Sequence, residues 1–487
     1  MGETSRQGQW TEKLFIGEWI GGTGGSAPVL EPATGEPIGS VALASQGDVN
    51  IAVERAALAQ RGWAQTSFDK RSAILQEAAR LLKARAERFQ HWNVRECGSI
   101  VPKAQWELDA SYNQLLMAAA LPMQPNGALF PSSMPGRVNT WHRIPLGVVA
   151  VIAPWNFPLL LALRSVAPAI ALGNAVVLKP DQQSAVTGGA LIAELFEDAG
   201  LPPGVLHVLP GSAQTGDALV RHPQVDMISF TGSTAVGRQI GELCGRMLKK
   251  ASLELGGNNP IIVLPDADLD KAASSAAWGA FLHQGQICMQ AGRHLVHRTI
   301  ADRFAAKLAV RAQKLVVGNP AKEPVHIGPL INDRQAERVE RIVQESVGMG
   351  ATIVAGGRRR GRFIEPTVLT GVTPQMPAFS EEIFGPVAPI TPFDSIDEAI
   401  ELAHASDYGL AAAIHSGSMS EAMAVARRLK SGMIHVNDQT VNNEFQVPFG
   451  GMGASGNGGR FGGPANIEEF TQSQWISATG IPIEYPF

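Results

Sequence analysis

Cysteine is scarce in this chain of 487 residues. The three cysteines, Cys97, Cys244 and Cys288, are too few and too scattered for a disulfide framework or a metal knuckle. We therefore expect no metal and a reducing compartment. The opening MGETSRQGQW has no basic segment followed by an apolar one, and it places Arg6 where a myristoylation signal needs Ser or Thr. These absences predict a cytoplasmic protein.

Strong charge and uninterrupted apolar runs are also lacking. Charged residues make up 17% of the chain and the formal net charge is −4, which gives no field that attracts nucleic acid or an anionic membrane. The most apolar stretch, 146–173, is long enough to span a bilayer, but Pro154, Asn156, Pro158 and Arg164 interrupt it. We expect a buried strand, a loop and a helix there. A small molecule is the expected partner, and neither nucleic acid nor a membrane is.

Hydrophobic residues, in contrast, make up 45% of the chain, which is typical of a globular protein. From Asp48 to about Pro122 the apolar residues recur with a helical period. An exposed strand is predicted at 137–145, and beyond it strands and helices alternate in two series. This alternation predicts two α/β domains with parallel sheets, divided near Gly256–Pro260, whose ligands bind beyond the carboxyl ends of the strands.

Two features favour a nucleotide ligand, although the motif G-x-G-x-x-G and the lysine of a P-loop are both missing. Gly232 and Gly237 lie between a predicted strand and a helix, where free N–H groups can bind a phosphate. A purely structural turn is an equal alternative. Lys179 ends a predicted strand and suits a ribose hydroxyl or a phosphate, or it simply extends to solvent.

Two polar residues follow apolar strands at places suited to chemistry. Asn156 lies between two prolines, and this stiff turn can hold the amide for an oxyanion; capping of the next helix has slightly more weight from spacing alone. Glu254 precedes two glycines, where it is either a general base with a raised pKa or an ordinary edge carboxylate.

Cys288 lies in the glycine-bounded stretch GQICMQAG, which lets a ligand approach closely. A free cysteine is most often a small buried hydrophobe, and this is the expectation for Cys97 and Cys244. His283 precedes Cys288 by five residues, an offset that does not align on one helix face. If Cys288 is a nucleophile, its base must therefore come from elsewhere in the chain.

Taken in order, the stretches PWNFP, KP, FTGSTAVG, LELGG, GQIC, EEIFGP and PFGG resemble those of the aldehyde dehydrogenase superfamily over essentially the whole chain. NVRECG, RSVAPA, FLHQGQ and the ending FGGPANIEEFTQSQWIS are similar to bacterial dehydrogenases of the benzaldehyde type. The resemblance implies an α/β fold with two Rossmann-like open parallel-sheet domains and a β-ribbon for oligomerisation, in a homodimer or homotetramer. It places an NAD-binding domain at 1–129 and 146–257, a catalytic domain at 258–455, and the ribbon and C-terminal segment at 130–145 and 456–487.

The resemblance implies NAD(P)-dependent oxidation of an aromatic aldehyde to a carboxylate. Cys288 matches the nucleophile that forms a thiohemiacetal and then a thioester, and Glu254 matches the base that activates the hydrolytic water. Asn156, together with the backbone N–H of Cys288, matches the oxyanion site. The family's motif SGxGRE is altered here, because Phe461 replaces its Glu. That position therefore offers no carboxylate as a second base, and Glu254 is the main candidate for the base.

NAD is the cofactor that the resemblance implies. The residues matched to its binding are Trp155, Lys179, Gln182, Gly232, Ser233, Gly237, Leu255, Glu382 and Phe384. The family commonly has Glu at the place of Gln182, where it repels the 2′-phosphate of NADP, so some use of NADP is also expected. The substrate tunnel is matched to Phe157, Leu161, Arg164 and Phe449, and the role of Arg164 is open.

Other functions remain as alternatives. Within the family these are a dehydrogenase of aliphatic aldehydes and an acylating enzyme that transfers the acyl group to coenzyme A; Glu254 argues against the latter, which needs no water-activating base. Outside it, Cys288 could serve a thiol esterase or hydrolase that uses no nicotinamide. A non-catalytic binding protein is disfavoured by the joint presence of Cys288, Glu254 and Asn156.

Overall fold

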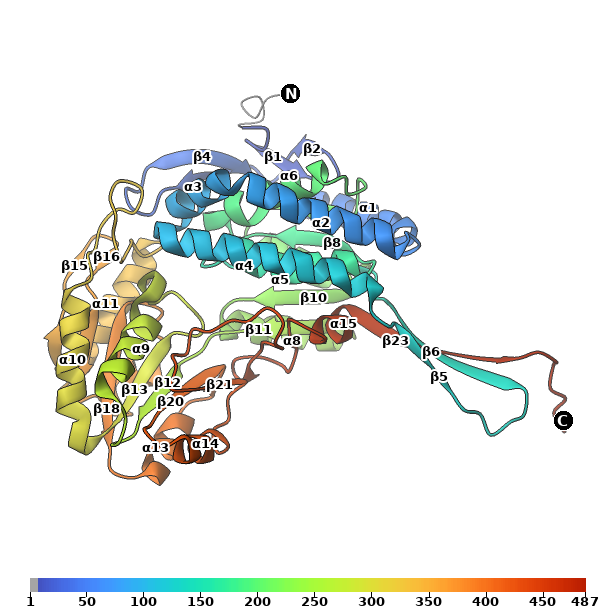
Figure 1. Ribbon diagram of the computed structural model, residues 1–487. Helices are drawn as coiled ribbons and strands as arrows, with labels where there is room; N and C mark the ends of the chain where they lie inside the picture. The colour runs from blue at the N-terminus through green and yellow to red at the C-terminus, as the bar shows by residue number, and fades with distance from the viewer. Residues whose placement is uncertain (1–7) are drawn as a thin grey trace.

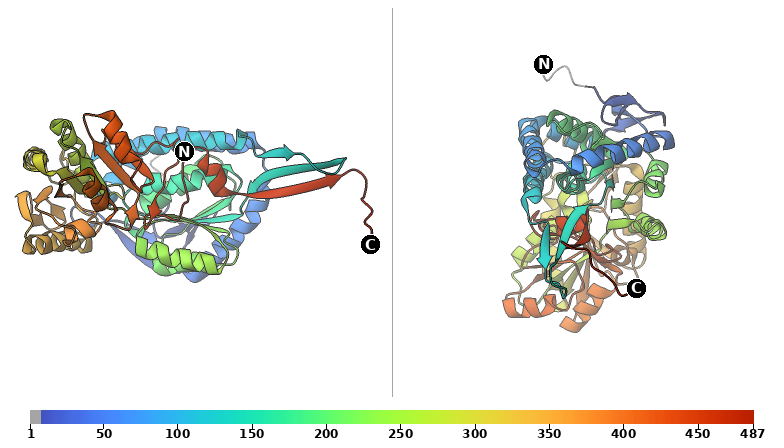
Figure 2. Two further views of the ribbon diagram at one scale, coloured as in Figure 1. Left: turned by 90° about the horizontal axis from the view of Figure 1, so that it is seen from below. Right: turned by 90° about the vertical axis from the view of Figure 1, so that its right-hand side faces the viewer.

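The computed structural model describes residues 8–487, which form two α/β lobes and a ribbon that projects from one of them (Figure 1). Each lobe is built on a seven-stranded sheet, and the ribbon is a three-stranded sheet. Figure 2 shows the ribbon extending well away from the body, with the C-terminus near its tip. The expected fold class of two open, largely parallel sheets and a ribbon is confirmed.

The first sheet has the strand order β11-β10-β7-β8-β9-β1-β2. Its strands are β1 (Lys13–Phe15), β2 (Trp19–Gly21), β7 (Val148–Ile152), β8 (Ala175–Lys179), β9 (Leu206–Val208), β10 (Met227–Thr231) and β11 (Lys250–Glu254). All pairs from β11 to β9 are parallel, whereas β1 is antiparallel to both β9 and β2. The chain places β8 and β9 on one side of β7 and β10 and β11 on the other. The topological switch point therefore lies between β7 and β10.

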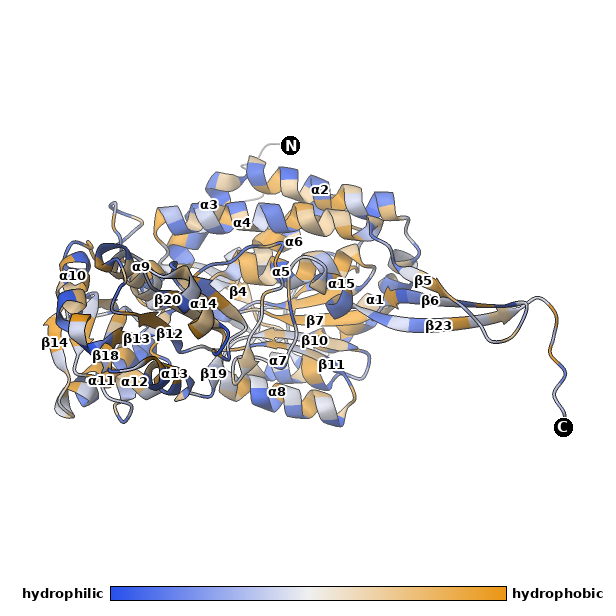
Figure 3. Ribbon diagram, turned by 60° about the horizontal axis from the view of Figure 1, so that its bottom comes forward, coloured by the Kyte–Doolittle hydropathy of each residue, from blue (hydrophilic) through white to orange (hydrophobic). Residues whose placement is uncertain are grey.

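Helices pack on both faces of the first sheet. One face carries α2 (Phe68–Ala84), α3 (Ala86–Cys97), α4 (Val101–Ala120), α5 (Pro158–Ala171) and α6 (Leu191–Asp198), and the other carries α1 (Gln46–Ala64), α7 (Ala213–Arg221) and α8 (Thr234–Arg246). The helical region predicted at 48–122 is confirmed as four helices. Every residue of α5 is buried, because it lies between the sheet and the outer helices, which explains its continuous apolar sequence. Figure 3 shows β7 and β10 mainly hydrophobic and α2 and α4 banded with hydrophilic residues.

The second sheet has the order β14-β17-β18-β13-β12-β20-β21, and only β14 runs antiparallel to its neighbour. Its strands are β12 (Asn259–Val263), β13 (Ala291–His297), β14 (Thr352–Ala355), β17 (Thr367–Thr370), β18 (Val387–Phe393), β20 (Ala411–His415) and β21 (Met433–Val436). One face packs against α9 (Leu269–Phe281) and α10 (Ala301–Gln313), the other against α11 (Asp333–Gly348), α12 (Pro377–Ser380), α13 (Ile396–His404) and α14 (Met419–Ala426).

The ribbon consists of β5 (Gly127–Phe130), β6 (Arg137–Pro145) and β23 (Thr471–Thr479), all antiparallel, with β6 in the middle. The exposed strand expected at 137–145 is thus found. The ribbon begins earlier than 130, because Gly127 already pairs with His142. Residues 456–470 differ from the expected C-terminal segment: they return to the body, where α15 (Ala465–Phe470) packs beside α5 and buries Phe470.

Three short antiparallel pairs complete the strands: β3 (Ser26–Leu30) with β4 (Pro37–Ala42), β15 (Arg359–Arg360) with β16 (Phe363–Ile364), and β19 (Tyr408–Gly409) with β22 (Met452–Gly453). The apolar stretch 146–173 forms β7, a loop and α5, as predicted. Within residues 8–487, no helix combines the length and the apolar character that crossing a membrane requires.

Candidate active site

The candidate residues from both lobes meet where the carboxyl ends of the first sheet face the second lobe. Lys179 and Glu254 are the last residues of β8 and β11, and Gly232 directly follows β10. Asn156 lies in the loop after β7, and Cys288 lies in the loop before β13. The loops after β7 and β10 flank the switch point of the first sheet. The site therefore lies where the strand–helix alternation predicts a ligand.

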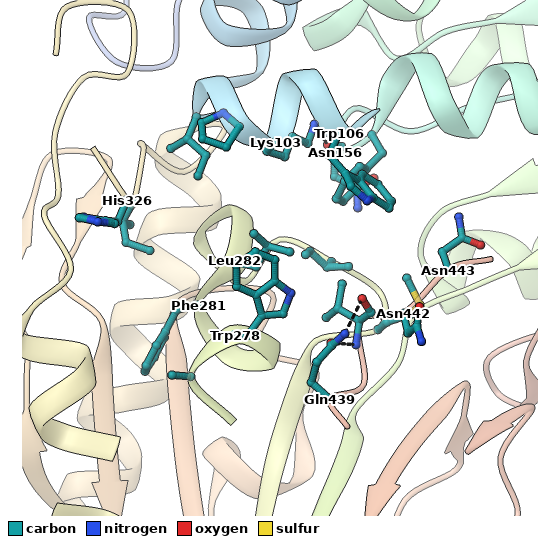
Figure 4. Close-up of a pocket in the computed structure, with 18 of the residues that line it drawn as sticks. Lys103, Trp106, Asn156, Trp278, Phe281, Leu282, His326, Gln439, Asn442 and Asn443 are labelled. Atoms are coloured by element: carbon teal, nitrogen blue, oxygen red, sulfur yellow. Dashed lines mark hydrogen bonds between the residues drawn. The ribbon is translucent and has the colours of Figure 1, made fainter. Parts of the chain in front are cut away.

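A cavity of about 850 Å³ reaches the partly buried thiol of Cys288. Figure 4 shows some of the side chains that line it, among them Asn156 and Trp278. Its walls are mostly apolar and aromatic, and they come from α4, α5, α9, the end of α10 with the segment after it, and the loop after β21. The four residues expected along a substrate tunnel, Phe157, Leu161, Arg164 and Phe449, all line it. Such a concave, apolar cavity with a few polar groups is typical of a small-molecule site.

Two tryptophans of the cavity were not predicted from the sequence. Trp106 of α4 and Trp278 of α9 line it from different lobes, and both stay partly exposed, which places them at its mouth. The ring of Trp106 meets the ring of Phe157 edge-on, with centroids 5.9 Å apart. In the sequence, each is only a tryptophan at an exposed position of a helix, and such a position does not predict a pocket.

The amide of Asn156 is directed at the loop that carries Cys288. Its side chain is buried, and Nδ2 donates to the carbonyl oxygen of Gln286 at 2.9 Å. Phe157, not Asn156, is the N-cap residue of α5, and no side chain caps that helix from this position. The capping alternative is therefore wrong. A primary amide has two N–H donors, so one donor is left for a ligand beside the thiol.

A buried ion pair holds the Asn156 loop in place. Nζ of Lys103 donates to the carbonyl oxygen of Asn156 at 2.8 Å and to Oε2 of Glu107 at 2.6 Å. The other oxygen of Glu107 accepts the N–H groups of Leu159 and Leu160 at 2.9 and 3.1 Å, which satisfies the first turn of α5. Both charged side chains are almost completely inaccessible. One helix of the outer layer thus fixes both the oxyanion candidate and the helix that follows it.

We expect Lys103→Met to reduce the free energy of unfolding by about 3 kcal/mol, because it leaves the carboxylate of Glu107 buried without its cation. Aldehyde-dependent activity should fall as well, since the carbonyl of Asn156 loses its donor. Urea unfolding and steady-state rates measure the two effects. Lys83→Met is a matched control, because Lys83 pairs with Asp109 at an exposed site. A Lys103→Met protein as stable as the wild type would contradict this account of the pair.

Glu254 is buried at the end of β11, so the alternative of an ordinary edge carboxylate is wrong. Burial raises its pKa to about 7, although the guanidinium of Arg164 acts in the opposite direction. The N–H of Gly451 lies 3.4 Å from Oε1 of Glu254. Glu254 is not among the residues that line the cavity; it lies behind them, close enough for its charge to raise the pKa of Cys288. A carboxyl that titrates near neutrality suits a general base.

The thiol of Cys288 does not ionise readily in this environment. Burial raises its pKa to about 12, and the largest opposing influence is the positive charge of Arg164. His283 is no substitute base, because burial holds its pKa well below the ordinary value and its ring packs against Phe157, with centroids 5.3 Å apart. As expected, Cys97 and Cys244 are simply buried.

The edge of the first sheet fits a dinucleotide. Ser233 is the exposed N-cap residue of α8 and makes no capping bond, so its hydroxyl and the first N–H groups of α8 are open to a phosphate. A Cβ at Gly237 would lie 2.2 Å from Leu255, so the helix comes this close to the strand end only with glycine. Lys179 is buried and does not extend to solvent; its Nζ has one long bond, 3.4 Å to the carbonyl of Pro180.

The other residues matched to the cofactor lie on both sides of this edge. The ring of Trp155 meets that of Phe384 edge-on, with centroids 5.6 Å apart. Glu382 accepts the N–H of Gly257 at 2.8 Å, and burial raises its pKa to about 7. Gln182 begins a short 3-10 turn after β8. The described chain offers no group of His, Cys, Asp and Glu that could hold a metal ion.

Comparison with known proteins identifies the family. Residues 19–476 match the aldehyde dehydrogenase family. The benzaldehyde dehydrogenase (NAD(+)) of Pseudomonas putida is 59% identical over 487 residues, with 100% of both chains covered. A vanillin dehydrogenase of Amycolatopsis sp. is 51% identical over 98% of this chain and 99% of its own. The solved structure of betaine aldehyde dehydrogenase from Staphylococcus aureus in complex with NAD+ has a TM-score of 0.95 at 31% identity, covering 98% of this chain and 96% of its own. This chain belongs to the aldehyde dehydrogenase family.

Proposed function

We propose that this protein oxidises aromatic aldehydes of the benzaldehyde type to carboxylates, with NAD as the hydride acceptor. The observation that carries the proposal is the cavity whose apolar and aromatic walls lead to the thiol of Cys288. A flat aromatic ring buries well against apolar and aromatic walls of this kind. The names of the benzaldehyde and vanillin dehydrogenases among its relatives support the substrate class, and the NAD(+) in the first of these names supports the cofactor.

In the proposed reaction, the thiol of Cys288 first loses its proton to water, and the resulting thiolate adds to the aldehyde carbonyl and forms a carbon–sulfur bond. The carbonyl oxygen becomes an alkoxide, which the free N–H of the Asn156 amide and the backbone N–H of Cys288 stabilise. Because Lys103 and Gln286 hold Asn156 in place, its amide is oriented before the charge develops. The result is a thiohemiacetal on Cys288.

Bound NAD would supply the acceptor for a hydride. Loss of that hydride from the thiohemiacetal carbon leaves a thioester on Cys288. Glu254 then accepts a proton from a water molecule, whose oxygen attacks the thioester carbon. The carbon–sulfur bond breaks, the carboxylic acid leaves, and the sulfur of Cys288 is restored. The proton passes from Glu254 to solvent, so the residue is ready for the next cycle.

We propose that residues 8–129 and 146–257 bind the dinucleotide and that 258–455 supply the catalytic thiol. The turn with Gly232, Ser233 and Gly237 would hold the pyrophosphate, Lys179 and Gln182 the adenosine ribose, and Trp155, Leu255, Glu382 and Phe384 the nicotinamide half. The open first turn of α8 and the poorly bonded Nζ of Lys179 support this assignment.

Gln182→Glu is expected to lower kcat/KM for NADP by about tenfold and to leave kcat/KM for NAD nearly unchanged. The reason is that a carboxylate beside the ribose repels a 2′-phosphate but accepts a hydrogen bond from a 2′-hydroxyl. Steady-state rates with each cofactor at a fixed aldehyde concentration measure the ratio. Gln183→Glu, one residue further along the same turn, is the matched control. Equal loss with both cofactors would contradict the placement of Gln182.

The experiment that tests the proposed function is a product balance with benzaldehyde. We expect NADH and benzoate in a one-to-one ratio, formed without coenzyme A and only when the nucleotide is present. Ester cleavage without nucleotide, and no NADH from aldehydes, would favour the thiol esterase alternative. A requirement for coenzyme A would favour the acylating alternative, and either result would overturn the proposal.

We also propose a cytoplasmic homo-oligomer, either a dimer or a tetramer, that associates through the ribbon. The outer edges of β5 and β23 pair with no other strand of the described chain. The ribbon also exposes large apolar side chains, including Leu129, Phe130 and Trp475. Unpaired strand edges with exposed apolar residues favour association with a second copy.

A further inference from the structure

Arg164 is a buried cation that the proposed mechanism does not use. It lies on α5, its side chain is 5% exposed, and it lines the same cavity as Cys288. Nη2 donates to Oγ1 of Thr231, the last residue of β10, at 3.0 Å. Its Nε is buried and makes no hydrogen bond in the described chain. The guanidinium thus reaches the sheet edge at which the catalytic candidates meet.

The sheet register places Glu254 beside this guanidinium. Thr231 pairs with Glu254 across the parallel strands β10 and β11, and paired residues direct their side chains to the same face of a sheet. That face is the one covered by α5, because Ser165 of α5 bonds Ser229, two residues before Thr231, at 2.8 Å. Arg164 therefore lines the cavity with Cys288 and lies on the same face of the sheet as the carboxylate of Glu254.

Two aromatic rings flank the charge of Arg164, and no carboxylate of the described residues forms a direct ion pair with it. Its Cζ lies 4.5 Å from the ring centroid of Phe461 and 5.0 Å from that of Phe449. No Asp or Glu of the described residues comes within 4.0 Å of it. Ring faces stabilise a desolvated guanidinium but leave its positive charge uncancelled. An acidic residue at position 461 would instead pair with Arg164 and remove most of its field.

We propose that Arg164 is a positioning residue whose uncancelled charge favours the ionised states of Cys288 and Glu254. The inference rests on the proposed function, which gives these two residues their roles. It adds that Arg164 supplies the positive charge that helps both of them to ionise. A guanidinium stays protonated throughout the working range of enzymes, so the field is constant. Phe449 and Phe461 hold the charge without neutralising it.

The charges around the two groups agree with this assignment. Arg164 is the leading influence that lowers the pKa of Cys288 and of Glu254, against the larger effect of burial. Glu254 and Glu382 act on Cys288 in the opposite direction, and Glu469 does so on Glu254. Arg460 is the other cation that acts on Glu254, but it does not line the cavity. Arg164 is thus the cation shared by both groups.

The test is alkylation of Cys288 by iodoacetamide without aldehyde or nucleotide, followed from pH 7 to 10. An uncharged reagent is chosen because Arg164 could attract an anionic one. Arg164→Met and Arg164→Gln remove the charge, Arg164→Lys keeps it, and Cys288→Ala gives the background. Either neutral variant is enough for the test if it melts cooperatively. Arg164→Met is expected to fold better than Arg164→Gln, because it replaces a buried charge with an apolar chain of similar length.

We expect the alkylation rate constant at pH 8 to fall by about tenfold or more in the neutral variants and to recover to within about threefold of wild type in Arg164→Lys. The inflection in the pH profile of kcat should move to higher pH in the neutral variants. A purely structural role would lower kcat without moving its pH profile, and Arg164→Lys would then not restore the alkylation rate. Unchanged alkylation in folded Arg164→Met protein would overturn the proposal. If the aldehyde oxidation itself is absent in wild type, the proposed function fails while the alkylation result still reports on Arg164.

Discussion

Cys288→Ala is expected to lower kcat/KM for aldehyde oxidation by at least about 10⁴-fold. Without the sulfur there is no thiohemiacetal from which a hydride can leave, and no other thiol reaches the cavity, because Cys97 and Cys244 are buried elsewhere. Initial rates of NADH formation from benzaldehyde measure the loss. Substantial residual turnover would contradict the assignment of the nucleophile.

A matched control separates this chemical loss from damage to the fold. Cys97→Ala removes a buried thiol at the end of α3 that does not line the cavity, and it should keep wild-type kcat/KM. Cys288→Ala should melt at nearly the wild-type temperature, since it removes a single sulfur atom at the wall of an open cavity. It should also bind NAD as tightly as the wild type, because the proposed dinucleotide residues are untouched.

Glu254→Gln is expected to form the thioester but to hydrolyse it about 10²- to 10³-fold more slowly, since the amide cannot accept a proton from water. The first turnover should appear as a burst of NADH equal to the number of active sites, followed by a slow steady state. Rapid mixing measures the burst, and mass spectrometry after acid quenching should find the acyl group on Cys288. Loss of the burst itself would contradict a role limited to hydrolysis.

The pH dependence of hydrolysis in the wild type follows from the same carboxyl. Burial raises the pKa of Glu254 to about 7, so below that pH most molecules carry a protonated group that cannot act as a base. The rate limited by hydrolysis should therefore rise with pH through about 7 and then level off. Glu254→Gln should lose this inflection, which ties the profile to one residue.

The strands, helices and position of the site could be predicted from local sequence because each depends on a short-range pattern. The alternation from Val148 onward predicts parallel sheets, and carboxyl strand ends predict where Lys179 and Glu254 lie. The meeting of Asn156, Glu254 and Cys288 has no local signal, since these residues are far apart in the chain. Only the resemblance of several motifs in one order predicted it.

Local spacing was misleading at Asn156 because a distant residue takes the role that spacing suggested. Capping of α5 looked slightly better than an oxyanion role, but Glu107 of α4 accepts the first N–H groups of α5. Lys103 and Glu107 are one helical turn apart, a spacing that is common in exposed ion pairs. Their burial depends on the packing of α4 against α5, which no window of sequence reveals.

Kinetic measurement of substrate choice tests the central claim most directly. We predict that kcat/KM with NAD is at least about tenfold higher for benzaldehyde than for hexanal, because the aromatic walls of the cavity bury a flat rigid ring at less entropic cost than a flexible chain. Both aldehydes are assayed with NAD and with NADP on one preparation of wild-type enzyme. A preference for hexanal, or aldehyde consumption without reduced nicotinamide, would contradict the account.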